Sequence, residues 1–220
     1  SYSNVLLMKI DHEGVQQWTK DHTFSSTDRL NSVKELPDGN LIMSGSTLSS
    51  SNSSKDVLIM KTDSFGNIIW QNTYGEQQDE VAHCIGMAMD GGFIVTGEMV
   101  DENTGYSLCY LLKTDGQGVL DWSRTFGGNQ NDYGYSVVQT NDAGYVISGS
   151  TRSQGDDNGD VWLIKTNGDG EIQWERTYGG NGSETSRSVK QTNDGGYIIT
   201  GNTDSFGSGY NDAYLVKTDS

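Results

Sequence analysis

The sequence repeats itself every 52 residues. The step links four tryptophans, and it also links a column of lysines and a column of glycines: Trp18, Trp70, Trp122 and Trp174; Lys9, Lys61, Lys113, Lys165 and Lys217; Gly14, Gly66, Gly118 and Gly170. Because the step is constant, no copy carries an insertion or a deletion relative to the next. A period of this length predicts one small unit of secondary structure that is stacked several times.

Each copy contains four stretches of alternating apolar and polar residues separated by glycine-rich turns, which predicts four short strands. In the third copy the expected strands are 135–140, 145–151, 160–166 and 171–178. The composition of 33% hydrophobic residues, 29 Gly and 1 Pro suits many short strands better than long helices. Four-stranded antiparallel units of this length are typical of β-propeller blades, with the first strand innermost and the fourth outermost.

We therefore predict an all-β chain, a single β-propeller domain over residues 1–220. Its copies span about 5–56, 57–108, 109–160 and 161–212, with a partial copy at 213–220. Four blades close a ring if the fourth strand at 15–23 completes the last blade. One third strand is then left over, because 5–10 and 213–218 are the same element. The alternatives are a larger propeller in a longer parent chain, or pairing of the extra strand with another molecule.

Three repeated columns have structural interpretations. The glycines in the second strand of each copy predict close contact between blades, since glycine is disfavoured inside a strand: Gly45, Gly97, Gly149 and Gly201. The tryptophans offer an apolar face to the neighbouring blade. The lysines are expected to pair with a carboxylate in a turn. We also expect Cys84 and Cys109 to be buried free thiols, because an intervening strand holds them beyond the ~7 Å limit for a disulfide.

Charge excludes several kinds of partner. The chain has 14 Lys plus Arg and 30 Asp plus Glu, a formal net charge of −16, which repels nucleic acid and anionic membrane surfaces. No apolar run approaches the ~20 residues that cross a bilayer, so no membrane insertion is expected. The chain begins at Ser1 without an initiating Met or a signal peptide, which suggests a processed product or a part of something longer.

The repeated string reads W-x-x-T-[YF]-G-G, then an acid, then S-V-x-Q-T-x-D-G-G-Y-I-I-[TS]-G-x-T and D-x-x-L-[IV]-K-T-[DN]. It resembles a propeller repeat common in large secreted and surface proteins of bacteria and archaea. The last two copies match it best, and the first departs from it at 22–24. The resemblance implies an extracellular or cell-surface propeller array and no defined activity.

Two sets of residues are candidates for a site. The first is an acidic column that begins the first strand of each copy: Asp28, Glu80, Asp132 and Glu184. Four carboxylates around one mouth of a propeller channel could bind a calcium ion, which prefers oxygen ligands. The alternative is that each carboxylate caps its own loop by accepting backbone N–H bonds.

The second set lies in long, unequal loops between the second and third strands: Tyr106, Asp156, Asp157, Asp204, Phe206 and Tyr210. Variable loops on a rigid scaffold are where binding residues collect, and aromatic side chains beside carboxylates suit a glycan or protein ligand. The alternative is that these are plain solvated loops.

Enzyme motifs are missing from the sequence. The three histidines at 12, 22 and 83 share no metal-ligand spacing, and there is neither a G-x-S-x-G elbow nor a phosphate loop. We therefore predict no enzymatic activity and no cofactor other than possible Ca²⁺. The predicted function is a non-catalytic extracellular binding module. The alternative is a structural spacer or self-assembling unit of a surface filament, joined by exchange of terminal strands.

Overall fold

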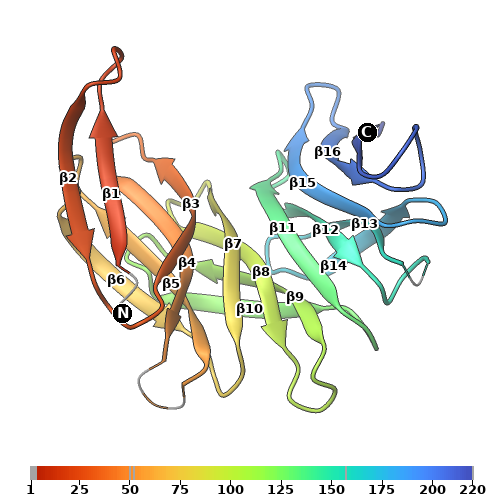
Figure 1. The fold of residues 1–220 in the computed structure, drawn as a ribbon, viewed down its shortest axis with the longest axis horizontal. Helices are drawn as coiled ribbons and strands as arrows, with labels where there is room; N and C mark the ends of the chain where they lie inside the picture. Colours follow the sequence, from red (N-terminus) through yellow and green to blue (C-terminus); the bar gives the residue numbers. More distant parts are fainter. Residues whose placement is uncertain (1–3, 50, 52, 157, 220) are drawn as a thin grey trace. The chain divides into compact units, whose positions relative to one another are not determined.

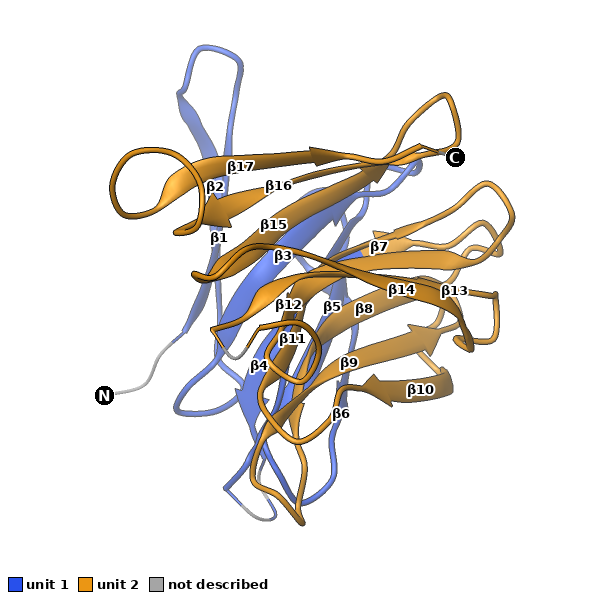
Figure 2. Ribbon diagram, turned by 90° about the vertical axis from the view of Figure 1, so that its right-hand side faces the viewer, with its two compact units in different colours: residues 1–85 blue, residues 86–220 orange. Residues whose placement is uncertain are grey.

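The computed structural model describes residues 4–49, 51, 53–156 and 158–219, and its regular elements are 17 β-strands (Figure 1). Within these residues no helix is present that could cross a membrane. The chain divides into two compact units, residues 1–85 and 86–220, and the division falls inside strand β7 (Figure 2). The prediction of an all-β fold is confirmed.

The first unit contains one hairpin and one four-stranded antiparallel sheet. The hairpin pairs β1 (Val5–Ile10) with β2 (Gln16–His22), and the sheet has the order β3 (Arg29–Glu35), β4 (Leu41–Leu48), β5 (Lys55–Thr62) and β6 (Ile68–Tyr74). A small core joins the two, in which Val5 of β1 packs with the buried Met43 and Met60 of the sheet. The extra third strand at the start of the chain therefore packs on the first complete sheet.

Strand β7 (Glu80–Met87) continues into the sheet formed with β8 (Phe93–Val100), β9 (Ser107–Thr114) and β10 (Leu120–Phe126). A second sheet has the order β11 (Asp132–Gln139), β12 (Tyr145–Thr151), β13 (Asp160–Thr166) and β14 (Ile172–Tyr178). The last sheet has three strands, β15 (Glu184–Gln191), β16 (Tyr197–Thr203) and β17 (Asp212–Lys217). Neighbours in each sheet are neighbours in the sequence, as expected for blades.

The predicted strand bounds agree closely with the structure. β1, β12 and β13 cover the predicted residues, whereas β11 begins three residues before the expected strand, at the acidic column. First strands of successive sheets also lie next to each other, because Ser136 in β11 accepts a hydrogen bond from the backbone N–H of Val189 in β15 at 3.2 Å. Ring closure, the number of blades and the domain bounds stay predictions.

Three of the four glycines in the second strands have a different cause from the predicted one. A Cβ on Gly149 would overlap the backbone carbonyl of Tyr133, which belongs to the paired strand β11 of the same sheet. The register shifts there between Gly134 and Ser136, which marks a β-bulge. Gly45 and Gly201 face the same kind of bulge. At these three positions the bulge carbonyl, and not the predicted neighbouring blade, occupies the space, whereas the carbonyl of Gly97 lies 3.4 Å from a Cβ on Gly134 of the next sheet.

The tryptophan and lysine columns behave as predicted in the second unit. The ring of Trp122 in β10 packs against Tyr145 of the next sheet, with 6.0 Å between ring centroids. The ammonium groups of three lysines pair with the aspartate of the turn between the first and second strands: Lys113 with Asp90 at 2.7 Å, Lys165 with Asp142 at 2.9 Å and Lys217 with Asp194 at 2.7 Å. These columns therefore build the fold.

Both cysteines are free thiols, as predicted. Cys109 in β9 is fully buried, but Cys84 in β7 is only partly buried, which corrects the expectation that both are buried. Burial raises the pKa of the Cys109 thiol to about 12. The two thiols therefore differ in reactivity.

Candidate functional site

The unequal loops between second and third strands contact the loops that precede the first strands. The backbone N–H of Arg152 donates to the carbonyl of Asn131 at 3.2 Å, and that of Asp204 donates to the carbonyl of Ser183 at 3.0 Å. Both kinds of loop therefore share one edge of their sheets.

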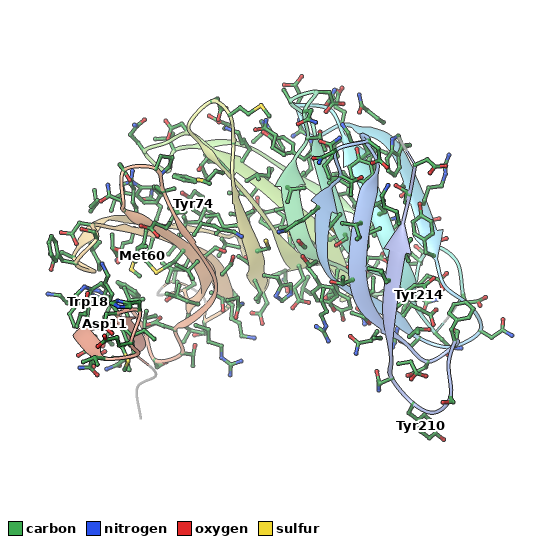
Figure 3. All side chains as sticks on the ribbon, turned by 90° about the horizontal axis from the view of Figure 1, so that it is seen from above. Asp11, Trp18, Met60, Tyr74, Tyr210 and Tyr214 are labelled. Atoms are coloured by element: carbon green, nitrogen blue, oxygen red, sulfur yellow. The ribbon has the colours of Figure 1, made fainter. Side chains whose placement is uncertain are left out.

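The predicted ligand residues on these loops are exposed, but several already have structural contacts. The ring of Phe206 stacks on Tyr214 with 5.7 Å between centroids, and a carboxylate oxygen of Asp204 accepts the backbone N–H of Asn211 at 2.7 Å. Tyr210 is 94% exposed and projects from its loop (Figure 3). Tyr106 and Asp156 are exposed, and Asp157 lies outside the described residues. Ligand binding by this set stays a prediction.

Three of the four acids in the predicted calcium column cap their own loops. Asp132 is fully buried and accepts from five donors: the backbone N–H groups of Gly128, Arg152 and Ser153 at 2.9, 3.2 and 3.2 Å, and the hydroxyls of Thr151 and Ser153 at 2.5 and 2.6 Å. Asp28 and Glu184 are bonded in the same way to Thr47 and Thr203. These bonds lower the pKa of Asp28 and of Glu184 despite their burial.

These bonds agree with the alternative expectation, in which each carboxylate of the column caps its own loop. Among the described residues there is no group of three or more His, Cys, Asp or Glu side chains that could hold a metal ion. A calcium ring formed by Asp28, Glu80, Asp132 and Glu184 stays a prediction.

Glu80 differs from the other members of the column. It is 1% exposed, and neither carboxylate oxygen has a hydrogen-bond partner among the described residues. The pKa of Glu80 is raised to about 7, chiefly by burial and then by the charges of Asp56, Glu76 and Asp79; the Glu76 backbone N–H acts in the opposite direction without reaching hydrogen-bond geometry. A carboxylate buried this deeply is closed to a substrate, so we do not assign catalysis to it.

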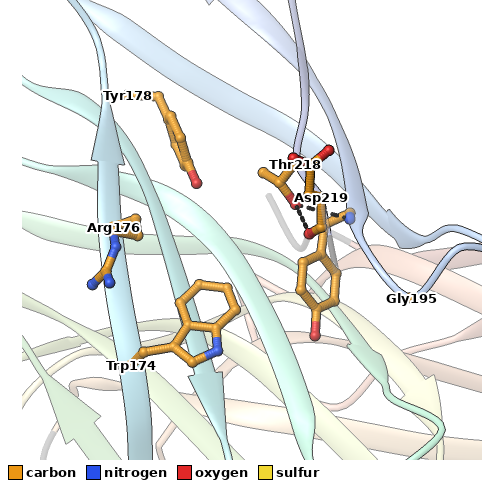
Figure 4. Close-up of a pocket in the computed structure, with 7 residues that line it drawn as sticks. Trp174, Arg176, Tyr178, Gly195, Thr218 and Asp219 are labelled. Carbon is orange, nitrogen blue, oxygen red and sulfur yellow. Dashed lines mark hydrogen bonds between the residues drawn. The ribbon is translucent and has the colours of Figure 1, made fainter.

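A pocket of about 300 Å³ lies in the second unit beside the last tryptophan of the column (Figure 4). Trp174, Arg176 and Tyr178 of β14 form one wall. The opposite side comes from the last sheet and the residues after it, so that the full lining is Trp174, Arg176, Tyr178, Gly195, Tyr197, Thr218 and Asp219. The pocket therefore combines three aromatic rings with one cation, one carboxylate and one hydroxyl.

The two tyrosines of this pocket have a defined protonation state, and Thr218 has a defined orientation. Burial raises the pKa of the Tyr178 and Tyr197 phenols, so both remain O–H donors at neutral pH. The Thr218 hydroxyl accepts the backbone N–H of Tyr197 at 3.0 Å, and the Thr218 backbone N–H donates to the Tyr197 carbonyl at 2.8 Å. These two bonds fix the residues that lead to Asp219.

Within the pocket the Trp174 ring packs beside Tyr197, with 5.8 Å between the ring centroids, whereas two other tryptophans of the column pack against glycine turns. A Cβ on Gly66 would stand 2.8 Å from Cζ3 of Trp18, and one on Gly170 would stand 2.7 Å from Cζ3 of Trp122. In both pairs the glycine follows the tryptophan by 48 residues. The sequence-based site prediction missed the pocket residues Trp174, Arg176 and Tyr178, because it interpreted the tryptophan column as structural.

Comparisons with solved structures bear on the fold. The chain is similar to the GH43 endo-arabinanase from Bacillus licheniformis, with a TM-score of 0.52 and 15% identity over 90% of this chain and 75% of that one. It is also similar to sucrose-6-phosphate hydrolase from Lactobacillus gasseri, with a TM-score of 0.48 and 11% identity over 84% and 45% of the two chains. No family model matches the sequence, and no curated protein does either.

The endo-arabinanase is a β-propeller enzyme, so the likeness supports a propeller-type fold for this chain. It also overturns the predicted function. We predicted a non-catalytic binding module, or alternatively a spacer or self-assembling unit, from the missing enzyme motifs and from a resemblance that implies no defined activity. The endo-arabinanase is a glycoside hydrolase, so a propeller-type fold is compatible with catalysis, and the predicted non-catalytic function is contradicted.

Proposed function

We propose that this chain acts on a neutral polysaccharide as a propeller glycoside hydrolase and that the Trp174 pocket holds a sugar residue of the substrate. The observation that carries the proposal is the pocket itself, in which the Trp174 indole lies with two tyrosine rings beside Arg176 and Asp219. A flat indole packs well against the C–H face of a sugar ring, and surrounding O–H and N–H groups can bond its hydroxyls.

The size and charge of the pocket support a neutral sugar. A volume of about 300 Å³ lies at the lower end of the range for small-molecule sites, which suits one or two sugar rings. Arg176 and Asp219 bring one charge of each sign to the lining. A net charge of −16 on the whole chain disfavours an anionic polysaccharide.

Asp219 is the carboxylate that this pocket offers to a glycosidic bond. Glycoside hydrolysis uses two carboxylic groups, one that protonates the leaving oxygen and one that acts as base or nucleophile. Asp219 is exposed, which leaves it accessible to substrate, in contrast to the buried Glu80. We assign Asp219 one of these two roles.

The test is the release of new reducing ends from a panel of neutral polysaccharides, beginning with arabinan because the similar endo-arabinanase is named for it. We expect Trp174→Ala to raise KM and Asp219→Asn to lower kcat by about 10²-fold or more. Leu215→Ser is a matched control, since Leu215 is 64% exposed on β17 and does not line the pocket. Failure of the wild-type chain to release reducing ends from every polysaccharide would overturn the proposal.

We also propose that the chain belongs to the secreted and surface propeller repeats that its sequence resembles, and that it works outside the cell. The repeated string around Trp122 and Trp174 supports this. A polysaccharide substrate fits the same location, because large glycans are met outside the cell.

A further inference from the structure

A second repeated acid lies beside the column that begins the first strands. The same step marks one position at, or one residue from, the start of every third strand, and the residues there are Asn4, Asp56, Leu108, Asp160 and Asp212. In the first unit the carboxylates of Asp56 and Glu80 both crowd the backbone of Gly75, where a Cβ would overlap Asp56 Oδ1 and stand 2.6 Å from Glu80 Oε2. In the second unit Asp160 and Glu184 take the same places around Gly179. Two carboxylates therefore converge wherever Asp occupies this position and the acid of the column follows.

The pair in the first unit holds three buried oxygens without a hydrogen-bond partner among the described residues: Asp56 Oδ1, Glu80 Oε1 and Glu80 Oε2. Glu80 is 1% exposed, so water does not solvate its carboxylate freely. An unpaired buried carboxylate costs several kcal/mol or more, so the charge must be removed by a proton or balanced by a cation.

The repeat explains why Glu80 lacks donors. The hydroxyl that bonds the column acid comes from Thr47, Thr151 and Thr203 in the other copies. The same step places Met99 at this position in the second copy, and methionine has no hydroxyl. Glu80 therefore lacks the threonine hydroxyl that bonds the equivalent acid in the other copies. It is also preceded by an acid in the third strand, Asp56.

The copies without an acid at the third strand serve as internal controls. With Asn4 in that position, Asp28 is bonded to Phe24, Ser25 and Thr47, and with Leu108 there, Asp132 has its five donors. None of their oxygens is among the buried unpaired atoms. Asp160 Oδ1 beside Glu184 is a further unpaired oxygen, and Asp212 Oδ2 is another at the same position of the repeat.

We propose that Asp56 and Glu80 bind one calcium ion in the first unit. Calcium accepts carboxylate oxygens in mono- or bidentate fashion and completes six to eight ligands with backbone carbonyls and water, without demanding a rigid geometry. The three unpaired oxygens supply this kind of ligand, and Glu76 and Asp79 add negative charge around them. Two carboxylates without a third predict a weak site, with a Kd of about 10⁻⁴–10⁻³ M, as in extracellular modules.

The experiment titrates CaCl₂ into the calcium-free full chain by calorimetry, with thermal unfolding as a second readout. We expect saturable binding in the stated range and a Tm that rises by roughly 2–4 °C at about ten times the Kd. Glu80→Gln keeps the shape of the side chain and removes its charge, so it should weaken binding at least tenfold and abolish the Tm rise. Asp56→Asn should act in the same way.

The test has one control variant, Asp28→Asn, and one control ion, Mg²⁺. Asp28→Asn removes a loop cap outside the pair, so it should lower Tm but leave the calcium response unchanged. A ring formed by the whole acidic column would instead lose its response in this variant. The proposal is overturned if wild type shows no calcium-dependent heat or Tm shift, if Glu80→Gln responds as wild type does, or if Mg²⁺ gives the same shift as Ca²⁺ at equal concentration.

Discussion

The backbone of Gly170 lies against the indole ring of Trp122, close enough that a Cβ would stand 2.7 Å from Cζ3. Gly66 covers Trp18 in the same way, at 2.8 Å. The turn glycine is thus part of the packing between successive copies as well as a residue with positive φ. Trp174 of the same column lines the pocket beside β14.

Gly170→Ala should destabilise the protein more than Gly14→Ala does. Both glycines have φ near +80°, so both variants carry the same backbone strain of about 1 kcal/mol. A methyl group at residue 170 also collides with Trp122, whereas nothing lies within 4 Å of a Cβ at residue 14. Urea unfolding should show an additional loss of about 1–3 kcal/mol for Gly170→Ala. Equal losses would contradict the packing role.

Gly149→Ala tests the bulge. A Cβ there overlaps the carbonyl of Tyr133 within the same sheet, so the paired strand must shift, and we expect a loss of about 3 kcal/mol in the free energy of unfolding. Gly168→Ala is the control, because its nearest neighbour would be the Ala143 carbonyl at 3.3 Å. That variant should lose less than about 1 kcal/mol. A tolerated Gly149→Ala would show that the bulge does not require glycine.

The raised pKa of the Glu80 carboxyl predicts that stability in calcium-free buffer depends on pH in an unusual way. Its pKa is raised from 4.5 to about 7 in the folded state, so the folded state binds the proton more tightly than the unfolded state. The contribution is therefore present below about pH 4.5 and is lost as pH rises to about 7.

Glu80→Gln should remove this component and raise the free energy of unfolding at pH 8 by about 3 kcal/mol, since one pKa unit corresponds to about 1.4 kcal/mol. Chemical unfolding of both proteins at several pH values measures the difference. A variant that is less stable than wild type at pH 8 would contradict the account of Glu80 as an unpaired buried charge.

The two thiols should react at different rates with a thiol reagent. Cys84 is partly buried, whereas Cys109 is 0% exposed and its pKa is raised to about 12, so it carries little thiolate. The native protein should expose one reactive thiol and the unfolded protein two. Cys84→Ser should leave the native protein unreactive. Two thiols that react at the same rate in the native state would be inconsistent with this burial.

Much of the fold could be predicted from the period and the alternation of residues. The bounds of β12 and β13 follow directly from the apolar pattern between glycine turns, because strand period and turn chemistry are local properties. The cause of the glycine at residue 149 could not be predicted, since a bulge depends on the register between two strands. The residues that form a strand can therefore be predicted from the sequence more easily than a bulge in the pairing of two strands.

The candidate sites were harder to predict because they arise where copies differ. The acidic column was found, but its capping role depends on which donors surround each carboxylate. Asp56 was overlooked because it lies 24 residues before Glu80 in another strand, and only the fold brings them together. The change from threonine to Met99 at one position of the repeat was the available signal.

The most direct test of the proposed function is the rate at which the purified chain releases reducing ends from arabinan and other neutral polysaccharides. The account predicts measurable release by wild type, a raised KM and therefore slower release at low substrate concentration in Trp174→Ala, a lowered kcat in Asp219→Asn, and unchanged activity in Leu215→Ser. Retention of the full rate by Trp174→Ala and Asp219→Asn, or the absence of release from every polysaccharide, would contradict it.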